Sequence, residues 1–398
     1  MAARIRVLMA ISGLAIGEPL GGAERFAVEL ALSLDRNIFE PSICALWRHD
    51  VPSEIYWVKR LAEEGVEVFF AADWGHGRSL TGYASALRSI ARHFQHAPVD
   101  IVHSHLPLAG LTALLLRRQL GARALVRTAL AGKEWGDGLT AVAFRQVFTN
   151  WVFPLTFDAE ACVSQALTDR FDRRPGARLR GRKALLLHNA IRLDRFAAGR
   201  DPAASSDKRS ELGLNAGDLV VGSVGRLSRE KGCFVLVDAA ARVTACRSDV
   251  RFLVVGDGPL REELGAQIGR LGLAGRIVLT GARTDVDAIY DTMDLFVLPS
   301  FWEGLPTVIM ESMACGVPVV ATDIPGTREL VTANRTGWLT PPGDSAGLAE
   351  TILAALASPA ERAHVAEAAR REVVPRFSIE EVANKYQKLY LRLLQRTA

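Results

Sequence analysis

The chain has 398 residues, of which 49% are hydrophobic, and it carries 48 lysines and arginines against 44 acidic residues. This length favours two domains, and the apolar fraction is large enough to build their cores, which excludes a globally disordered chain. The best candidate for a membrane span, residues 106–116, is too short to cross a bilayer, so we expect a cytoplasmic protein.

Short apolar runs rich in β-branched residues alternate with longer helical patterns along the whole chain. The predicted strands of the first half are residues 5–11, 40–46, 66–70, 101–105, 124–128, 161–163 and 184–188. Those of the second half are residues 220–224, 251–255, 277–280, 295–298, 317–321 and 337–339. Predicted helices between them include residues 23–34, 232–245, 260–271 and 307–315. Such alternation is typical of parallel sheets with helices on both faces.

The strand–helix series runs twice, and a polar stretch rich in Pro and Ser, residues 200–208, is typical of a linker. We therefore predict an α/β fold with two Rossmann-like domains, residues 1–200 and 201–376, that face each other across a cleft. Ligands of such folds bind at the carboxyl ends of the strands. The last segment, residues 377–398, has an apolar stripe at helical spacing and predicts an amphipathic helix.

A glycine-rich stretch follows the first predicted strand. Four glycines, among them Gly21 and Gly22, lie within residues 12–24 and precede an Ala-rich helix. Glycines let the backbone approach a phosphate closely, and the N–H groups at a helix start attract an anion. The spacing matches neither G-x-G-x-x-G nor the P-loop, so a plain tight turn is the alternative.

A second glycine-bearing turn, residues 221–232, follows the first strand of the second half. Two cations beside a helix start, Arg226 and Lys231, are suited to clamp a diphosphate, with exposed loop cations as the alternative. Gly256 and Gly258 follow the next strand and repeat the pattern.

Two glutamates lie eight positions apart in residues 299–321. Glu303 stands on the loop after a strand, and Glu311 lies inside the apolar helix that follows. A charge at a core-like position is costly without a fixed partner, and Glu311 could accept two hydrogen bonds from a sugar cis-diol. A structural salt bridge is the alternative. Backbone N–H groups able to meet an anion are expected near Gly304, Leu305 and Thr307.

These motifs together resemble the retaining GT-B glycosyltransferases of family 4, the glycosyl transferases group 1. The matching residues are Gly21-Gly22, Gly225-Arg226 with Lys231-Gly232, and the pair Glu303 and Glu311. The resemblance covers almost the whole chain, and its most specific part is the Pro-Ser-x-x-Glu-Gly-x-Pro context. It implies transfer of a sugar from a nucleotide-diphosphate donor, usually UDP-linked, to a hydroxyl acceptor with retention of configuration. It also implies that the C-terminal helix crosses back to the N-terminal domain.

The resemblance further implies roles for individual residues. Arg226 and Lys231 would stabilise charge on the leaving nucleotide, and Glu303 would contact the donor sugar. His105 matches a histidine near the transferred sugar, with a buried structural imidazole as the alternative. The catalytic candidates are His105, Arg226, Lys231 and Glu303. The donor-binding candidates are Gly21, Gly22, Gly225, Gly256, Gly258, Arg283, Gly304, Leu305, Thr307 and Glu311.

A rival pattern is Asp285-Val-Asp287, which matches the D-x-D motif by which other sugar transferases hold a divalent metal. Acidic residues also favour a helix N-terminus, which is the simpler interpretation. Because two cations already supply positive charge, we expect no metal and no cofactor.

Other function classes remain. A nicotinamide-dependent oxidoreductase would need a dinucleotide fingerprint, which neither half supplies. A sugar-nucleotide epimerase of similar fold and a non-catalytic nucleotide-sugar-binding protein stay as alternatives.

The acceptor is expected to contact the N-terminal half. Residues 1–200 carry 26 basic against 19 acidic side chains, whereas residues 201–398 carry 22 against 25. The basic run in residues 170–183 is interpreted either as a solvated loop or, with Arg117, Arg118, Arg123 and Arg127, as a contact for anionic lipid. A lipid-linked saccharide and peripheral contact with the inner face of the cell membrane are therefore expected. No nucleic-acid motif accompanies the charge.

Overall fold

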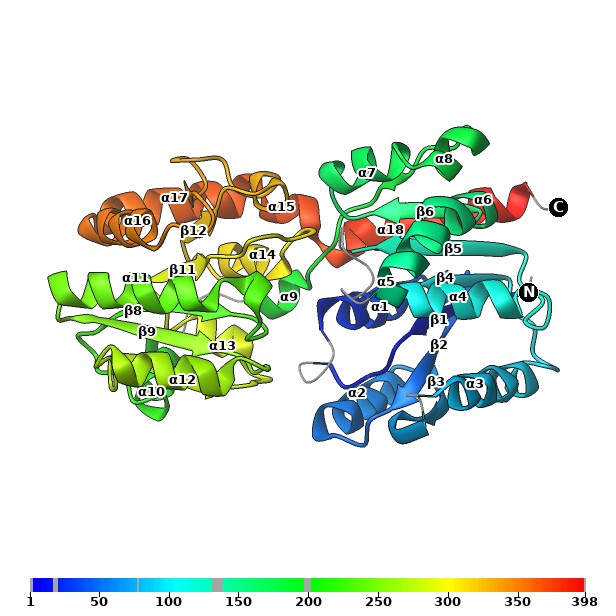
Figure 1. Cartoon of the computed structure of the whole chain (residues 1–398), viewed down its shortest axis with the longest axis horizontal. Coiled ribbons are helices and arrows are strands. Elements are labelled where there is room, and N and C mark those ends of the chain that lie inside the picture. The colour runs from blue at the N-terminus through cyan, green and yellow to red at the C-terminus, as the bar shows by residue number, and fades with distance from the viewer. Residues whose placement is uncertain (1–2, 17–20, 77–78, 131–138, 197–201, 397–398) are drawn as a thin grey trace. The chain divides into compact units, whose positions relative to one another are not determined.

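A computed structural model describes residues 3–16, 21–76, 79–130, 139–196 and 202–396 (Figure 1). The chain divides into two compact units, of which the first is Met1–Ala190 with Ile379–Ala398 and the second is Ile191–Ser378. The observed division thus comes ten residues before the predicted boundary at residue 200, which lies outside the described residues.

The first unit is built on a seven-stranded parallel sheet with the order β3-β2-β1-β4-β5-β6-β7. Its strands are β1 (Ile5–Ile11), β2 (Phe39–Arg48), β3 (Glu67–Asp73), β4 (Ile101–Ser104), β5 (Ala124–Ala129), β6 (Ala159–Cys162) and β7 (Leu185–Leu186). Its longer helices are α1 (Gly22–Leu32), α2 (Pro52–Glu63), α3 (Leu80–His93), α4 (Pro107–Leu116) and α18 (Ile379–Gln395). A run of short helices comprises α5 (Leu139–Phe144), the π-helix η2 (Arg145–Val152), α6 (Phe153–Thr156), α7 (Gln165–Asp172) and α8 (Pro175–Arg180).

The second unit is built on a six-stranded parallel sheet with the order β10-β9-β8-β11-β12-β13. Its strands are β8 (Leu219–Val224), β9 (Val250–Val255), β10 (Ile277–Gly281), β11 (Leu295–Leu298), β12 (Val319–Thr322) and β13 (Trp338–Thr340). Its helices are α9 (Leu193–Phe196), α10 (Pro202–Glu211), α11 (Cys233–Cys246), α12 (Arg261–Arg270), α13 (Val286–Tyr290), α14 (Thr307–Ala314), α15 (Pro325–Arg328), α16 (Ser345–Ala357) and α17 (Pro359–Glu372). The predicted α/β class with two Rossmann-like sheets is confirmed.

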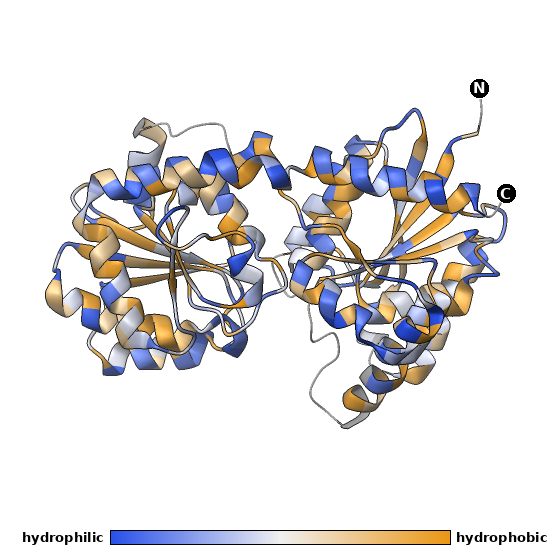
Figure 2. Cartoon of the chain, turned by 90° about the horizontal axis from the view of Figure 1, so that it is seen from above, coloured by the Kyte–Doolittle hydropathy of each residue, from blue (hydrophilic) through white to orange (hydrophobic). Residues whose placement is uncertain are grey.

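In both units the strands are predominantly apolar and the helices turn polar faces outward (Figure 2). This pattern follows from parallel sheets covered on both faces, because strands buried on both sides carry continuous apolar runs. None of the helices in the described part of the chain is both long and apolar enough to cross a membrane.

The C-terminal helix α18 returns to the first unit and completes its core, which confirms that part of the predicted fold. The buried hydroxyl of Tyr390 lies 2.6 Å from His103 Nδ1, and His103 Nε2 lies 2.7 Å from Thr128 Oγ1. The Tyr386 hydroxyl lies 2.8 Å from the same Thr128 oxygen. Side chains of β4 and β5 thereby satisfy the polar groups that the helix buries.

Two sequence-based interpretations of polar segments were wrong. Residues 202–211 form helix α10 rather than a linker, because Lys208 and Arg209 pair with Asp285 and Asp294 of the same unit. Most of the basic run in residues 170–183 lies in the last turn of α7 and in α8 rather than in a loop.

Candidate functional site

The turn between β8 and α11 is held against the loop that follows β11. Gly232 has a φ of +67°, and a Cβ there would overlap the Pro299 carbonyl oxygen, so only glycine fits. The Phe301 N–H donates to the Glu230 carbonyl at 2.8 Å. This close approach brings the predicted diphosphate turn and the predicted Glu303 loop together at the carboxyl ends of two neighbouring strands.

The turn after β9 packs on the turn after β8 in the same manner. A Cβ at Gly256, with φ +133°, would overlap the Gly225 carbonyl, and one at Gly258 would lie 2.5 Å from the Leu227 carbonyl oxygen. Hydrogen bonds from Gly225 N–H to Val255 O and from Leu227 N–H to Asp257 O, both 2.9 Å, fix this arrangement. These glycines therefore have a packing role, and donor binding at Gly256 and Gly258 stays a prediction.

Lys231 and Glu303 form an ion pair in this unit. The Lys231 Nζ lies 2.6 Å from Glu303 Oε1, and the buried Ser300 hydroxyl donates to the same oxygen at 2.7 Å. The side chains are 25% and 10% exposed, so the pair borders solvent without being immersed in it. The sequence analysis included Ser300 in the Pro-Ser-x-x-Glu-Gly-x-Pro context but gave it no role.

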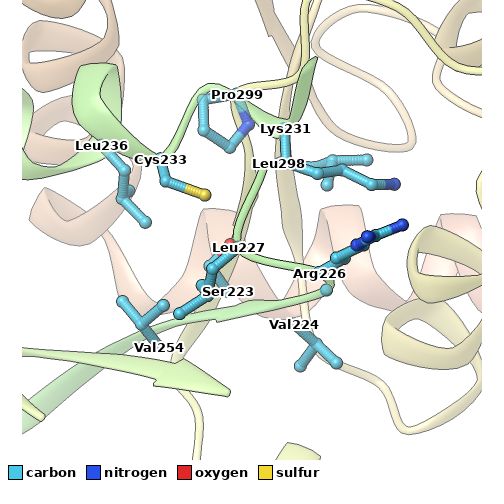
Figure 3. A pocket seen from close by; sticks show the side chains of 11 residues that line it. Ser223, Val224, Arg226, Leu227, Lys231, Cys233, Leu236, Val254, Leu298 and Pro299 are labelled. Carbon is cyan, nitrogen blue, oxygen red and sulfur yellow. The ribbon is translucent and has the colours of Figure 1, made fainter. Parts of the chain in front are cut away.

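Arg226 is exposed beside this pair. Within the described part of the chain its guanidinium has no hydrogen-bond or ion-pair partner, so it is available to an anion. Figure 3 shows Arg226 and Lys231 extending in the same direction from a small pocket, away from Leu236 and Cys233. The lining residues are Ser223, Val224, Gly225, Arg226, Leu227, Lys231, Cys233, Leu236, Val254, Leu298 and Pro299.

Glu311 is a buried carboxylate, as the sequence predicts. It is 1% exposed on α14, and the Tyr290 hydroxyl lies 3.2 Å from its Oε2. The same hydroxyl lies 3.1 Å from the Val308 carbonyl oxygen. A fully buried tyrosine on α13 is thus a polar partner of Glu311, and the sequence gives no sign of it because 21 positions separate the two residues.

The start of α14 presents backbone N–H groups. Among the described residues no side chain caps this helix, whose N-cap is Pro306. The Ile309 N–H donates to the Pro306 carbonyl at 3.2 Å, so the N–H groups of Thr307 and Val308 are the ones that can meet an anion. A Cβ at Gly326 of α15 would lie 2.7 Å from the Glu303 carbonyl oxygen, which shows how tightly the loop is supported. The predicted residues Gly304 and Leu305 are buried in this loop, and Thr307 is half-buried.

Arg283 lies in a different cluster from Lys231 and Glu303. It donates to Asp285 at 2.6 and 2.8 Å and to Glu211 of α10 at 2.7 Å. Its hydrogen bonds hold the pKa of the Asp285 carboxyl well below its usual range. The observed partners of Arg283 are thus structural, and its contact with the donor stays a prediction.

The two carboxylates of the D-x-D pattern are likewise paired with basic side chains. Asp285 also accepts from Lys208 at 2.8 Å, and Asp287 accepts from Arg195 at 2.8 Å. Both carboxylates are thus paired with basic side chains within the second unit.

His105 lies just after β4 in the first unit and is 1% exposed. Neither ring nitrogen has a hydrogen-bond partner in the described part of the chain. Burial lowers the pKa of His105 to about 3, so the imidazole is neutral at physiological pH. Its ring lies 4.1 Å from that of His103 and 5.8 Å from that of Phe26, measured between centroids. The His105 ring thus packs against two aromatic rings, while both of its nitrogens are buried without a hydrogen-bond partner among the described residues.

Gly21 and Gly22 stand at the start of α1, where a Cβ would meet open space. The Gly21 N–H donates to Glu24 Oε2 at 3.2 Å, and Glu24 is 3% exposed. Burial raises the pKa of Glu24 to about 7. Sequence reasoning missed this carboxylate, because an acidic residue in a first helical turn is commonplace. Residues 17–20 of the predicted glycine-rich stretch lie outside the described residues.

Comparisons with known proteins agree with these two units. A family model described as a glycosyl transferase 4-like domain matches residues 21–189, and one described as glycosyl transferases group 1 matches residues 205–372. Both models together extend over most of the chain.

Several curated proteins are similar in sequence. Alpha-D-kanosaminyltransferase of Streptomyces kanamyceticus is 31% identical over 50% of this chain and 51% of its own length. The lipopolysaccharide core biosynthesis mannosyltransferase LpsB of Rhizobium meliloti is 33% identical over 49% of this chain and 57% of its own. This chain thus spans little more than half the length of these two relatives. The Escherichia coli UDP-Gal:alpha-D-GlcNAc-diphosphoundecaprenol alpha-1,3-galactosyltransferase is 27% identical over 70% of this chain and 71% of its own.

Solved structures share the fold over nearly the whole chain. Anabaena HepE in complex with UDP and glucose superimposes with a TM-score of 0.80 and 25% identity, covering 98% of this chain and 100% of HepE. Sucrose-phosphate synthase from Thermosynechococcus elongatus has a TM-score of 0.77 at 21% identity, covering 99% of this chain and 100% of its own.

Proposed function

This chain belongs to the GT-B glycosyltransferases of group 1, and on that premise we propose that it transfers a hexose from a UDP-linked sugar to a hydroxyl acceptor with retention of configuration. The observation that carries the proposal is the Lys231–Glu303 pair beside the exposed Arg226, at the carboxyl ends of adjacent strands. UDP as the nucleotide is supported by HepE, whose crystal structures contain UDP and glucose or UDP-glucose.

The chemistry follows from where charge develops. When the bond between the anomeric carbon and the diphosphate oxygen breaks, negative charge accumulates on the departing UDP. Lys231 stabilises that charge without reorganising, because Glu303 already holds its ammonium in place, and the exposed Arg226 supplies a second cation. The N–H groups at the start of α14 add to the positive potential. No metal is required in this scheme.

Glu303 and Glu311 bind the two sugars of the donor. Glu303 uses one oxygen for Lys231 and Ser300, which leaves its other oxygen for a hydroxyl of the transferred sugar. Glu311, buried beside Tyr290, accepts from the ribose hydroxyls. A charged acceptor contributes roughly 1.5–3 kcal/mol per hydrogen bond, enough to offset part of the cost of burying it.

Retention follows from displacement on one face of the sugar. The acceptor oxygen forms a bond to the anomeric carbon on the side from which UDP departs, and the acceptor proton passes to the leaving phosphate oxygen. Detection of a covalent glycosyl-enzyme by mass spectrometry would contradict this step.

The acceptor is proposed to be a lipid-linked saccharide in cell-surface polysaccharide synthesis, reached at the cytoplasmic face of the membrane. Relatives named for transfer to a diphosphoundecaprenol-linked sugar and for lipopolysaccharide core synthesis support this class.

The test is a panel of UDP-, GDP- and ADP-sugars, each incubated with and without a diphosphate-linked lipid saccharide. We expect acceptor-dependent release of UDP, an α-linked product by NMR coupling constants from an α-linked donor, and no loss of rate with EDTA. Conversion of one nucleotide sugar into another without UDP release would instead establish an epimerase. A rise in thermal midpoint with a donor but no turnover with any acceptor would establish a binding protein.

A further inference from the structure

Large apolar side chains lie exposed along the helical run that leads from α5 through the π-helix η2 to α6. They are Phe144, Val147, Trp151 and Leu155. Their exposed fractions lie between 39% and 52%, which is high for large apolar side chains on a structured segment. Such a row costs free energy in water unless something covers it.

Helix α8 runs alongside this segment and extends the surface. A Cβ at Gly176 would lie within 3.0 Å of the Trp151 backbone, and the Arg174 guanidinium donates to Thr149 O. Arg180 donates to Pro154 O at 3.0 Å. The outward face of α8 carries Leu179, which is 72% exposed.

The cations of this region divide into two classes. Arg127 and Arg174 are buried and paired with Glu160, and Arg117 pairs with Asp158, so the expectation that Arg127 meets lipid was wrong. By contrast, the side chains that are exposed around Leu179 are Arg173, Arg178, Arg182 and Lys183. Residues 139–157 and 173–183 contain no Asp or Glu, and the nearby Asp158 and Glu160 are already paired.

We propose that the surface formed by Phe144, Val147, Trp151, Leu155 and Leu179, with the exposed cations in and beside α8, docks this protein on an anionic lipid bilayer. The apolar row enters the boundary between headgroups and acyl chains, where Trp is favoured, and the cations meet lipid phosphates. A second copy of the chain is a poorer partner, because a symmetric dimer would oppose two cationic surfaces. This inference refines the membrane contact within the proposed function.

The test is flotation with vesicles of pure phosphatidylcholine and of phosphatidylcholine mixed with phosphatidylglycerol, at low and high salt. Neither donor nor acceptor is present, so failure here leaves glycosyl transfer untouched. We expect binding only to the anionic vesicles, weakened by salt. Because each cation near such a surface strengthens binding about fivefold, the double variant Arg178→Glu with Leu179→Ser should bind at least about tenfold more weakly.

The matched control is Arg270→Glu with Leu271→Ser, an exposed Arg-Leu pair at the end of α12 in the second unit. It should bind vesicles as the parent protein does. Trp151→Ser, tested separately, should also weaken binding, and unchanged circular dichroism shows that each variant is folded. Equal binding to both vesicle types, or equal effects of the two double variants, would overturn the proposal. So would a concentration-dependent dimer in sedimentation that Leu179→Ser abolishes, because a second copy would then cover this surface.

Discussion

The Lys231 ammonium lies 2.6 Å from the Glu303 carboxylate, although 72 positions separate them in the chain. The contact exists because Gly232 lets the turn after β8 press against the Pro299 carbonyl, at the beginning of the Glu303 loop. It orients the cation before any ligand arrives, which is the condition for effective stabilisation of developing charge.

Replacing Lys231 by alanine should lower kcat by about 10²–10³-fold, as for the loss of one donor in an oxyanion hole. UDP release at saturating donor measures the effect. Arg229→Ala is the control, because Arg229 lies on the same turn, is 80% exposed and only approaches Glu263 at 3.9 Å. A rate within twofold of the parent for Lys231→Ala would refute the proposed clamp.

Replacing Glu311 by glutamine should raise the Kd for the UDP-sugar about 10- to 100-fold, because hydrogen bonds to a charged acceptor are worth roughly 1.5–3 kcal/mol each. Isothermal titration measures it. Tyr290→Phe should raise the Kd less and lower the free energy of unfolding by about 1 kcal/mol. Glu350→Gln, at an exposed position on α16, is the control. Unaltered affinity in Glu311→Gln would show that the ribose binds elsewhere.

Replacing Glu24 by glutamine should change the pH dependence of stability. Burial raises the pKa of Glu24 from 4.5 to about 7, so the folded state holds this proton more tightly than the unfolded state does. The raised pKa stabilises the folded state by at most about 3 kcal/mol. This stabilisation is fully present below pH 4.5 and is lost as the pH rises to about 7. Urea unfolding across this range should show Glu24→Gln gaining stability relative to the parent as pH rises. A constant difference between the two proteins would mean that Glu24 titrates normally.

Replacing His105 by asparagine should protect the protein against acid. Burial lowers the pKa of His105 from 6.5 to about 3, so below pH 6.5 the unfolded state takes up a proton that the folded state refuses. As the pH falls from 6.5 to about 3, the protonation of His105 therefore lowers the free energy of unfolding by at most about 5 kcal/mol. The variant should lose less stability than the parent protein as the pH falls, as measured by urea midpoints at successive pH values. Parallel pH profiles would contradict the assignment.

Replacing Gly232 by alanine should lower the free energy of unfolding by at least about 2 kcal/mol, since the left-handed backbone and the overlap with Pro299 both oppose a side chain. Gly265→Ala on α12 is the matched control, because a Cβ there meets open space and alanine favours a helix by about 1 kcal/mol. Denaturant unfolding compares them. Equal stability of the two variants would show that the turn can move away from Pro299.

Local sequence patterns predicted the secondary structure of this protein and the positions of several site residues. Alternating strand and helix patterns predicted every strand of both sheets, because apolar periodicity and glycine turns act within a few residues. The same local logic placed Arg226, Lys231 and Glu303 after strands, where parallel sheets present their ligands.

Which side chains meet was decided only by tertiary structure. Tyr290 beside Glu311, Glu211 beside Arg283, and the burial of Glu24 depend on elements that approach through space. Arg127 and Arg178 are both arginines in the basic half, yet one is buried on Glu160 and the other is exposed. Composition cannot separate them, because burial and pairing are properties of the packed chain and not of the residue type.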